Sequence, residues 1–168
     1  MKKFLTLCLS TFLLTGCASI DKIINNDTSE EPDVTEETDT TAKTLNCSND
    51  SGETWTFTAE GNKIKTGKLV FSLNKSDLGI TDEMDDTTVK DTINEALNNK
   101  YSLDGVTASG EMKDDKIEIT LDIDYDKADD QALIDAGLMT EGEKQNQYVS
   151  IKKTKEIYEN SNYSCSYQ

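Results

Sequence analysis

The sequence contains neither histidine nor arginine, and all 17 basic residues among its 168 are lysines. The lack of histidine excludes Ser-His-Asp and Cys-His catalysis as well as histidine metal sites. The lack of arginine excludes bidentate recognition of phosphate by a guanidinium group. We therefore predict a protein that is not an enzyme and that has no catalytic residues, no metal site and no cofactor.

Long hydrophobic runs are also lacking, apart from one near the start of the sequence. Lys2 and Lys3 precede the uncharged stretch FLTLCLSTFLL, which covers residues 4–14. At about 1.5 Å of rise per residue, a helix of this length spans roughly half of the ~30 Å hydrocarbon core of a membrane. A positive start, a short apolar middle and a small-residue end are typical of a secretory signal peptide.

The apolar stretch ends in Leu14-Thr15-Gly16-Cys17, which resembles the lipobox of bacterial lipoproteins. The resemblance implies cleavage between Gly16 and Cys17 and attachment of a diacylglycerol to the Cys17 thiol. We expect residues 1–16 to be a lipoprotein signal peptide. The mature protein would be anchored by its lipid to the cell membrane and exposed on the extracytoplasmic side. The alternative is an ordinary secretory signal that contains a cysteine by chance.

Acidic residues outnumber basic ones by 33 to 17, and loss of the signal would remove Lys2 and Lys3. The mature chain would then carry 15 lysines against 33 acidic residues, a net charge of −18. Such a surface repels nucleic acid phosphates and anionic lipid head groups. We expect no nucleic acid partner.

Proline occurs once, at Pro32, in a segment of residues 25–43 that is almost wholly Asp, Glu, Thr, Ser and Asn. Few apolar residues and charge of one sign leave too little burial to offset the entropy of ordering. We predict that residues 17–43 form the lipidated N-terminus and a disordered acidic tether, which holds the domain away from the membrane. An acidic calcium-binding tail is the alternative.

From residue 44 onward apolar and polar residues alternate, which predicts β-strands. In TWTFTAEGNKIKTGKLVFSLN, residues 54–74, one strand face carries Trp55, Phe57 and Ala59. Gly61-Asn62 then predicts a turn to a partner strand. A second pair of strands is expected over residues 106–112 and 117–125, and a last strand at residues 162–168.

Three segments have helical patterns. Thr81 is expected to cap a helix that runs to about Lys100, because the first turn is acidic and apolar residues recur at helical spacing. Shorter helices are expected at residues 127–136, ended by Gly137, and at residues 150–160, capped by Ser150. Amphipathic strands with interspersed helices favour an antiparallel sheet covered on one face by about three helices. We predict a single α+β domain over residues 44–168.

Two segments resemble a known family. The first, YSLDGVTASGEMKDDKIEITLDIDYDKAD at residues 101–129, contains a Gly-Val, a Lys-Asp hairpin and an alternating strand that ends in Asp-Tyr-x-Lys-Ala. The second, VSIKKTKEIYENSNYS at residues 149–164, matches a final helix and strand. Both are similar to the YehR-like family of small bacterial lipoproteins. The resemblance implies an envelope lipoprotein with one α+β domain, and it supplies no catalytic residue.

Three aspartates alternate along one expected strand, at Asp122, Asp124 and Asp126. They match the start of a calcium loop, but Lys127 stands where the loop needs glycine and Leu133 where it needs glutamate. Alternation instead predicts that they form a solvated strand face.

Two further groups could carry chemistry. Ser150 and Lys153 have the spacing of a nucleophile and its base, but at a helix start this pattern indicates a cap followed by solvated lysines. Aromatic residues are numerous enough to line a ligand pocket, although most fall on predicted inner faces and are expected in the core. They are Trp55, Phe57, Phe71, Tyr101, Tyr125, Tyr158, Tyr163 and Tyr167.

The sequence has four cysteines. Cys8 would leave with the signal and Cys17 would carry the lipid. Cys47 and Cys165 would remain in an exported protein, where disulfides persist. Both lie in expected terminal strands of one sheet, where neighbouring positions suit the Cα spacing of a disulfide. We predict a Cys47–Cys165 disulfide, with two separate free thiols as the alternative.

These observations favour a non-enzymatic envelope lipoprotein that binds an envelope protein or a surface component. The alternative is a lipoprotein that binds a small ligand or a metal ion in a pocket between sheet and helices. A pocket would appear as an apolar cavity with convergent polar groups. A protein-binding role would leave an exposed apolar patch or an open sheet edge.

Overall fold

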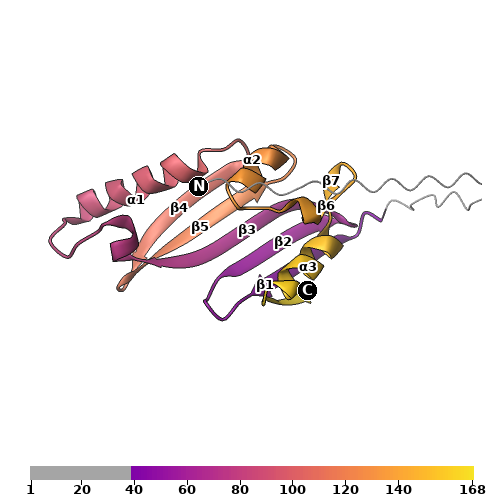
Figure 1. Cartoon of the computed structure of the whole chain (residues 1–168), viewed down its shortest axis with the longest axis horizontal. Helices are drawn as coiled ribbons and strands as arrows, with labels where there is room; N and C mark the ends of the chain where they lie inside the picture. The colour runs from indigo at the N-terminus through magenta and orange to yellow at the C-terminus, as the bar shows by residue number, and fades with distance from the viewer. Residues whose placement is uncertain (1–38) are drawn as a thin grey trace, which may run out of the picture. The chain divides into compact units, whose positions relative to one another are not determined.

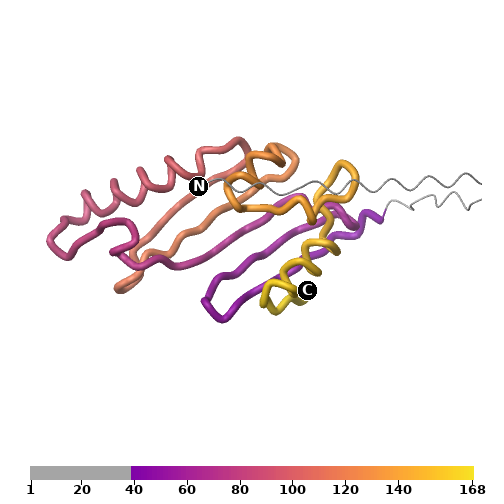
Figure 2. Tube along the Cα trace, viewed as in Figure 1, coloured from indigo at the N-terminus to yellow at the C-terminus, as the bar shows by residue number. Residues whose placement is uncertain are grey.

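The computed structural model describes residues 39–168 (Figure 1 and Figure 2). The predicted signal peptide, the Gly16–Cys17 cleavage and lipidation site and the tether as far as residue 38 lie outside the described residues. Within the described part, no helix is long and apolar enough to cross a membrane.

The core element is a six-stranded sheet in which all neighbouring strands are antiparallel. Its strand order is β4-β5-β3-β2-β1-β8. The last strand therefore lies beside the first, as the yellow and indigo segments show in Figure 2. The strands are β1 (Ala42–Ser48), β2 (Thr54–Glu60), β3 (Lys63–Asn74), β4 (Val106–Lys113), β5 (Lys116–Asp124) and β8 (Ser164–Tyr167).

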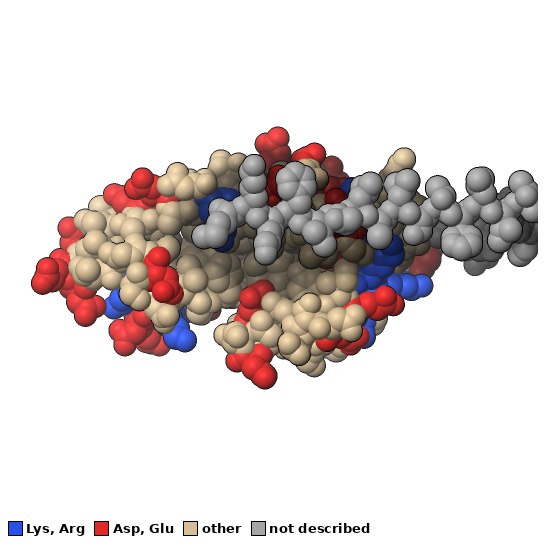
Figure 3. All heavy atoms as spheres, viewed as in Figure 1, with Lys and Arg blue, Asp and Glu red and all other residues tan. Residues whose placement is uncertain are grey.

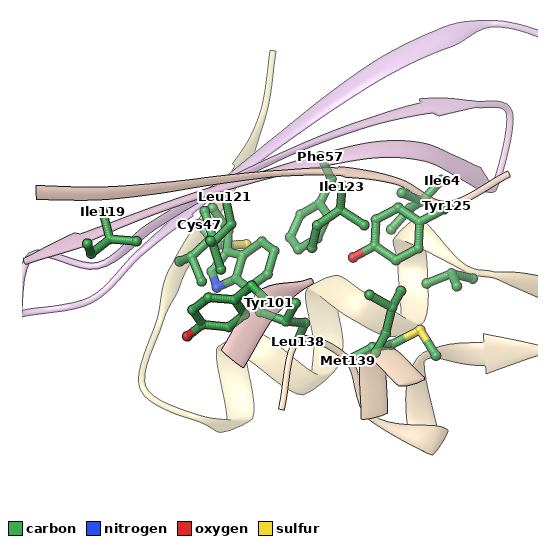
Figure 4. Packing of buried hydrophobic residues seen from close by; sticks show 14 of the residues in the cluster. Cys47, Phe57, Ile64, Tyr101, Ile119, Leu121, Ile123, Tyr125, Leu138 and Met139 are labelled. Atoms are coloured by element: carbon green, nitrogen blue, oxygen red, sulfur yellow. The ribbon is translucent and has the colours of Figure 1, made fainter. Parts of the chain in front are cut away.

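Helices and short turns complete the domain. The α+β prediction is confirmed, because the three α-helices pack on one side of the antiparallel sheet (Figure 1 and Figure 4). Two further strands, β6 and β7, have two residues each and form a separate two-stranded sheet. The remaining elements are η1 (Lys75–Leu78), α1 (Asp86–Tyr101), α2 (Asp130–Asp135), η2 (Glu141–Glu143), β6 (Lys144–Gln145), β7 (Tyr148–Val149) and α3 (Ile151–Asn160).

Two of the predicted helix starts are wrong. The N-cap of α1 is Asp85 in place of Thr81, because the Asp85 carboxylate accepts the Thr88 backbone N–H at 2.9 Å. Residues 81–84 form a turn in which the Met84 N–H donates to the Thr81 carbonyl at 3.2 Å, so they precede the helix.

The start of α2 is wrong for a similar reason. The backbone N–H groups of Lys127 and Ala128 bond back to the Asp124 carbonyl in a turn. Asp129 then caps the helix by accepting the Ala132 N–H at 2.9 Å. In α3 the predicted cap is confirmed, since Ser150 accepts the Lys153 N–H at 3.3 Å.

The core lies between the sheet and the helices. Alternating residues of β5 from Ile117 to Ile123 point into it, and so does Tyr125 directly after the strand, as the sequence predicts. At Gly110 in β4 the contact with α1 is so close that an added Cβ would lie 2.5 Å from Ile93 Cγ2. Glycine is required there because any side chain would push the helix away from the strand.

On the opposite face of the sheet no helix of residues 39–168 packs, and the side chains there are largely polar (Figure 4). A shallow depression of about 590 Å³ lies over β2, β3, β4 and β5 on this face. The large hydrophobic side chains that are exposed in the described region are Met112 and Tyr167. Side chains that line the depression include Thr56, Thr58, Thr66, Lys68, Thr107 and Asp122.

Candidate functional site

Four aromatic rings meet where α3 crosses β2. Trp55 and Phe57 project from the same face of β2 and stack with ring centroids 5.1 Å apart. Tyr158 of α3 meets both rings edge to face, at 5.8 Å and 5.5 Å. Tyr163, in the link to β8, meets Tyr158 at 4.9 Å and 70°. Alternation along β2 and helical spacing in α3 bring these rings together, as the predicted inner faces required.

A pocket of about 200 Å³ opens beside this cluster, between the sheet, α3 and the segment before η2. Leu138 and Met139 of that segment face Phe57 and Tyr125 across the core (Figure 4). The wall is largely apolar, but two carboxylates converge on it. The lining residues are Glu53, Trp55, Leu69, Gly137, Leu138, Met139, Thr140, Glu143, Ile157, Tyr158, Ser161 and Tyr163.

Glu53 is the carboxylate next to the aromatic rings. Its Oε1 atom accepts the Trp55 indole N–H at 3.1 Å and the Tyr163 hydroxyl at 2.6 Å. Burial raises the pKa of Tyr163, and its hydrogen bond to Glu53 raises it further. Tyr163 therefore stays a neutral hydrogen donor that holds the Glu53 carboxylate in place.

Glu143 is the second carboxylate, and only 1% of it is exposed. Its Oε1 accepts the Thr140 backbone N–H at 2.8 Å, and its Oε2 accepts the Thr154 hydroxyl at 3.0 Å. Burial raises the pKa of Glu143, and these hydrogen bonds oppose the shift. The carboxyl thereby joins η2 to α3 at the base of the pocket.

The buried phenol of Tyr125 and the half-buried phenol of Tyr158 lie within electrostatic range of Glu143. Burial raises the pKa of Tyr125 and of Tyr158, and the nearby Glu143 carboxylate adds to both shifts. The Tyr125 hydroxyl is buried and has no hydrogen-bond partner among the described residues. The interior beside the pocket is thus a region where negative charge is disfavoured by burial.

Asn62, in the turn between β2 and β3, positions α3 over the pocket. Its side-chain oxygen accepts the Ser150 hydroxyl at 3.1 Å, and its carbonyl accepts the Ile151 N–H at 3.0 Å. Its amide nitrogen donates to Gln145 Oε1 at 2.9 Å. One turn residue therefore fixes the start of α3 and the β6–β7 hairpin.

The structure contains the Cys47–Cys165 disulfide that the sequence predicts. The two residues are directly paired between β1 and β8. Because Tyr163 precedes Cys165 by two residues, the disulfide also holds one wall of the pocket against the sheet.

The three alternating aspartates do not converge. Asp122 points to the polar face of the sheet, and the Asp124 carboxylate pairs with Lys127 at 2.6 Å. Asp126 pairs with Lys63 at 2.7 Å and also with Lys65. The prediction that these aspartates form a solvated face is confirmed, and ion pairs with Lys63 and Lys65 of β3 hold Asp126 in position.

The Ser150–Lys153 pair is confirmed as a helix cap. The Ser150 hydroxyl is fully buried and bonded to Asn62. The Lys153 ammonium points elsewhere and donates to the Lys144 carbonyl at 2.7 Å.

The aromatic prediction is partly corrected. Phe57, Tyr101 and Tyr125 are buried in the core as expected, whereas Trp55, Tyr158 and Tyr163 also line the pocket. Tyr167 is 46% exposed.

Sequence reasoning missed both carboxylates. A signal for Glu143 exists, because Thr140 and Glu143 have the Ser/Thr-x-x-Glu spacing of a capping box, and η2 contains that box. Glu53 has no comparable signal, since its partner Tyr163 is 110 residues away.

Residues 39–164 match the family described as Protein of unknown function (DUF1307). The chain belongs to this family. Among curated proteins, nothing matches the DUF1307 chain. Its fold is similar to the NMR structure of the E. coli YehR protein, with a TM-score of 0.56 and 16% identity, over 74% of this chain and 88% of that one. The resemblance to YehR-like proteins is thus confirmed at the level of family and fold.

A protein from Streptococcus pneumoniae TIGR4, also solved by NMR, is similar with a TM-score of 0.48 and 13% identity. The match covers 96% of the DUF1307 chain and 100% of the pneumococcal one.

Proposed function

We propose that this DUF1307 protein is a lipid-anchored, non-enzymatic envelope lipoprotein whose extracytoplasmic domain binds a small ligand. The ligand occupies the pocket between the sheet and α3. The observation that supports this proposal is the convergence of Glu53, Glu143 and three aromatic rings on one pocket of about 200 Å³. Apolar pockets with a few placed polar groups are the usual form of small-molecule sites.

The surface composition supports the choice of a small ligand over a protein partner. Protein-binding sites are commonly contiguous apolar patches. In residues 39–168 two large hydrophobic side chains are exposed, those of Met112 and Tyr167. They come from opposite edge strands of the sheet, β4 and β8, and form no common patch.

Trp55 provides a direct test, because it is the one tryptophan in the sequence and it lines the pocket. We expect saturable quenching or enhancement of its fluorescence by at least one class in a panel of small cations, anions, sugars and amino acids. Ser161→Phe places a ring at the pocket and should abolish the response. Asn160→Phe, at a neighbouring exposed position that does not line the pocket, should not.

A response that survives Ser161→Phe would place binding elsewhere. If no class of compound in the panel binds, the proposal of a small-ligand site is wrong.

A second candidate is binding of a surface component on the polar face of the sheet. Threonine hydroxyls and Lys68 line the depression there, which suits a hydroxyl-rich glycan. In this case Thr56→Glu should abolish binding of purified envelope polysaccharide, whereas Ser161→Phe should leave it unchanged.

A further inference from the structure

Hydrogen donors around the pocket are consumed within the protein. The Trp55 N–H and the Tyr163 hydroxyl both donate to Glu53, and the Thr140 hydroxyl donates to Glu143 at 3.3 Å. Of the lining side chains, the hydroxyls of Tyr158 and Ser161 are the ones that make no hydrogen bond to another described residue. A phosphate or a carboxylate only accepts hydrogen bonds, and it needs more donors than these two hydroxyls supply.

Acceptors and negative charge remain at the pocket. Two lining residues are acidic and none is basic. Glu53 Oε1 takes both of the hydrogen bonds that the described residues donate to this side chain, which leaves Oε2 available to a ligand. A cleft lined by charge of one sign concentrates ligands of the opposite sign. The whole chain adds to this potential, with a net charge of −16, and acidic side chains are prominent on the face in Figure 3.

The aromatic walls complement a cation as well. Trp55 and Tyr158 meet at 75°, and Tyr158 and Tyr163 at 70°, so the three rings cannot form one flat stack. Aromatic faces attract ammonium groups through the ring quadrupole, most strongly for tryptophan. The pocket is also smaller than the roughly 300 to 1,000 Å³ that suits a drug-sized ligand.

From these observations we infer that the pocket binds a small organic ammonium cation, with Glu53 as the counter-ion and Trp55, Tyr158 and Tyr163 as the aromatic contacts. This inference rests on the proposed small-ligand function and specifies its ligand class. Glu143 holds η2 and α3 together at the pocket through its hydrogen bonds to Thr140 and Thr154.

Matched probes test the charge requirement. Choline and 3,3-dimethylbutan-1-ol have nearly the same shape, but only choline is charged. We expect choline to shift Trp55 fluorescence saturably and the neutral alcohol to bind at least tenfold more weakly. Propylammonium, a primary amine, tests whether the ligand is an alkylated ammonium or any amine. Isothermal calorimetry of the same protein gives the stoichiometry, which should be one.

Variants that remove one carboxylate charge test whether Glu53 is the counter-ion of the bound cation. Glu53→Gln should weaken choline binding at least tenfold while its retained oxygen still accepts the Tyr163 hydroxyl. Glu141→Gln removes one exposed charge from η2 outside the pocket and should change the affinity less than twofold. Circular dichroism and the urea midpoint show whether each variant is folded.

The outcomes separate this inference from the function on which it rests. If the neutral alcohol binds as tightly as choline, or if only anions or sugars from the panel bind, the cation inference is wrong and the small-ligand proposal stands. If Glu53→Gln is folded and binds choline normally, the assignment of the counter-ion is wrong. If nothing binds, both proposals fail.

Discussion

Cys47 and Cys165 face each other at a non-hydrogen-bonded position of the β1–β8 pair, with Cα atoms 4.1 Å apart. Hydrogen-bonded and non-hydrogen-bonded residue pairs alternate along two antiparallel strands. The Gln168 N–H donates to the Thr44 carbonyl at 2.9 Å, so Thr44 and Gln168 form a hydrogen-bonded pair. Cys47 and Cys165 lie three pairs away and therefore form a non-hydrogen-bonded pair, in which the Cα atoms are closer together. The disulfide therefore joins β1 and β8 at the kind of position where side chains of neighbouring strands come nearest.

Reduction of this disulfide should destabilise the domain. The cysteines are 118 residues apart in sequence, and closing a loop of that length restricts the unfolded chain by about 4 to 5 kcal/mol in the chain-entropy model. We expect the urea midpoint to fall by a corresponding amount in reductant and in Cys47→Ala/Cys165→Ala. Thiol counting on a denatured, non-reduced chain of residues 18–168, which contains only Cys47 and Cys165, should find none, and two after reduction. Two thiols before reduction would contradict the pairing.

Gly110→Val should separate α1 from β4. The added Cβ would lie 2.5 Å from Ile93 Cγ2 and 2.9 Å from Ile119 Cδ1. Overpacking of this kind costs about 1 to 3 kcal/mol, measurable by urea denaturation. Ser109→Val, one residue earlier on the exposed opposite face, is the matched control and should be nearly neutral. Equal stability of the two variants would show that α1 does not pack as described.

Glu143→Gln should change how stability depends on pH. Burial raises the folded-state pKa of Glu143 above its ordinary 4.5, so the native state holds this proton more tightly than the unfolded state. Its contribution to the free energy of unfolding is therefore full below pH 4.5 and declines as the pH rises through the folded pKa. Stability of the wild type relative to Glu143→Gln should fall over this window in urea denaturation series.

The experiment compares the free energy of unfolding of the wild type with that of Glu143→Gln at each pH, because other carboxyl groups make stability change with pH in the opposite direction. Hydrogen bonds from Lys63 and Lys65 lower the pKa of Asp126, so its contribution is lost as the pH falls. Glu141→Gln, at an exposed site of the same short helix, is the matched control for the loss of one carboxylate. A flat difference for Glu143→Gln would mean that Glu143 is not desolvated.

Cys17→Ser should release the protein from the membrane fraction. The proposal places all of the acyl chains on this cysteine, and stable anchoring needs more than one chain. We expect the variant to be recovered without lipid mass by mass spectrometry, and Cys8→Ser to remain anchored. A Cys17→Ser protein that stays membrane-bound with its lipid would overturn the lipoprotein assignment.

Local patterns in the sequence predicted the sheet and its buried face. Trp55, Phe57 and the inward residues of β5 follow from alternation alone, and Ser150 follows from capping chemistry. The start of α1 could not be predicted in this way, because Thr81 and Asp85 are both acceptable caps. The structure selects Asp85, whose carboxylate accepts the Thr88 N–H.

The pocket depends on contacts that local patterns do not encode. Tyr163 reaches Glu53 across 110 residues of sequence, and the bond exists only once β8 lies beside β1. The sequence did indicate a disulfide between these strands, because two cysteines remained after the signal and the lipid were accounted for. The place of Glu53 next to the aromatic rings required the full strand order.

Because β8 is the final strand, the order in which the chain is made has a consequence for assembly. Until residues 164–167 emerge, β1 is an unprotected edge of the sheet and offers its backbone to other chains. Pairing over so long a sequence distance makes folding slow. Under the export that we propose, this delay would keep the polypeptide unfolded long enough for translocation, and the sheet would be completed on the oxidising side, where the Cys47–Cys165 disulfide can form.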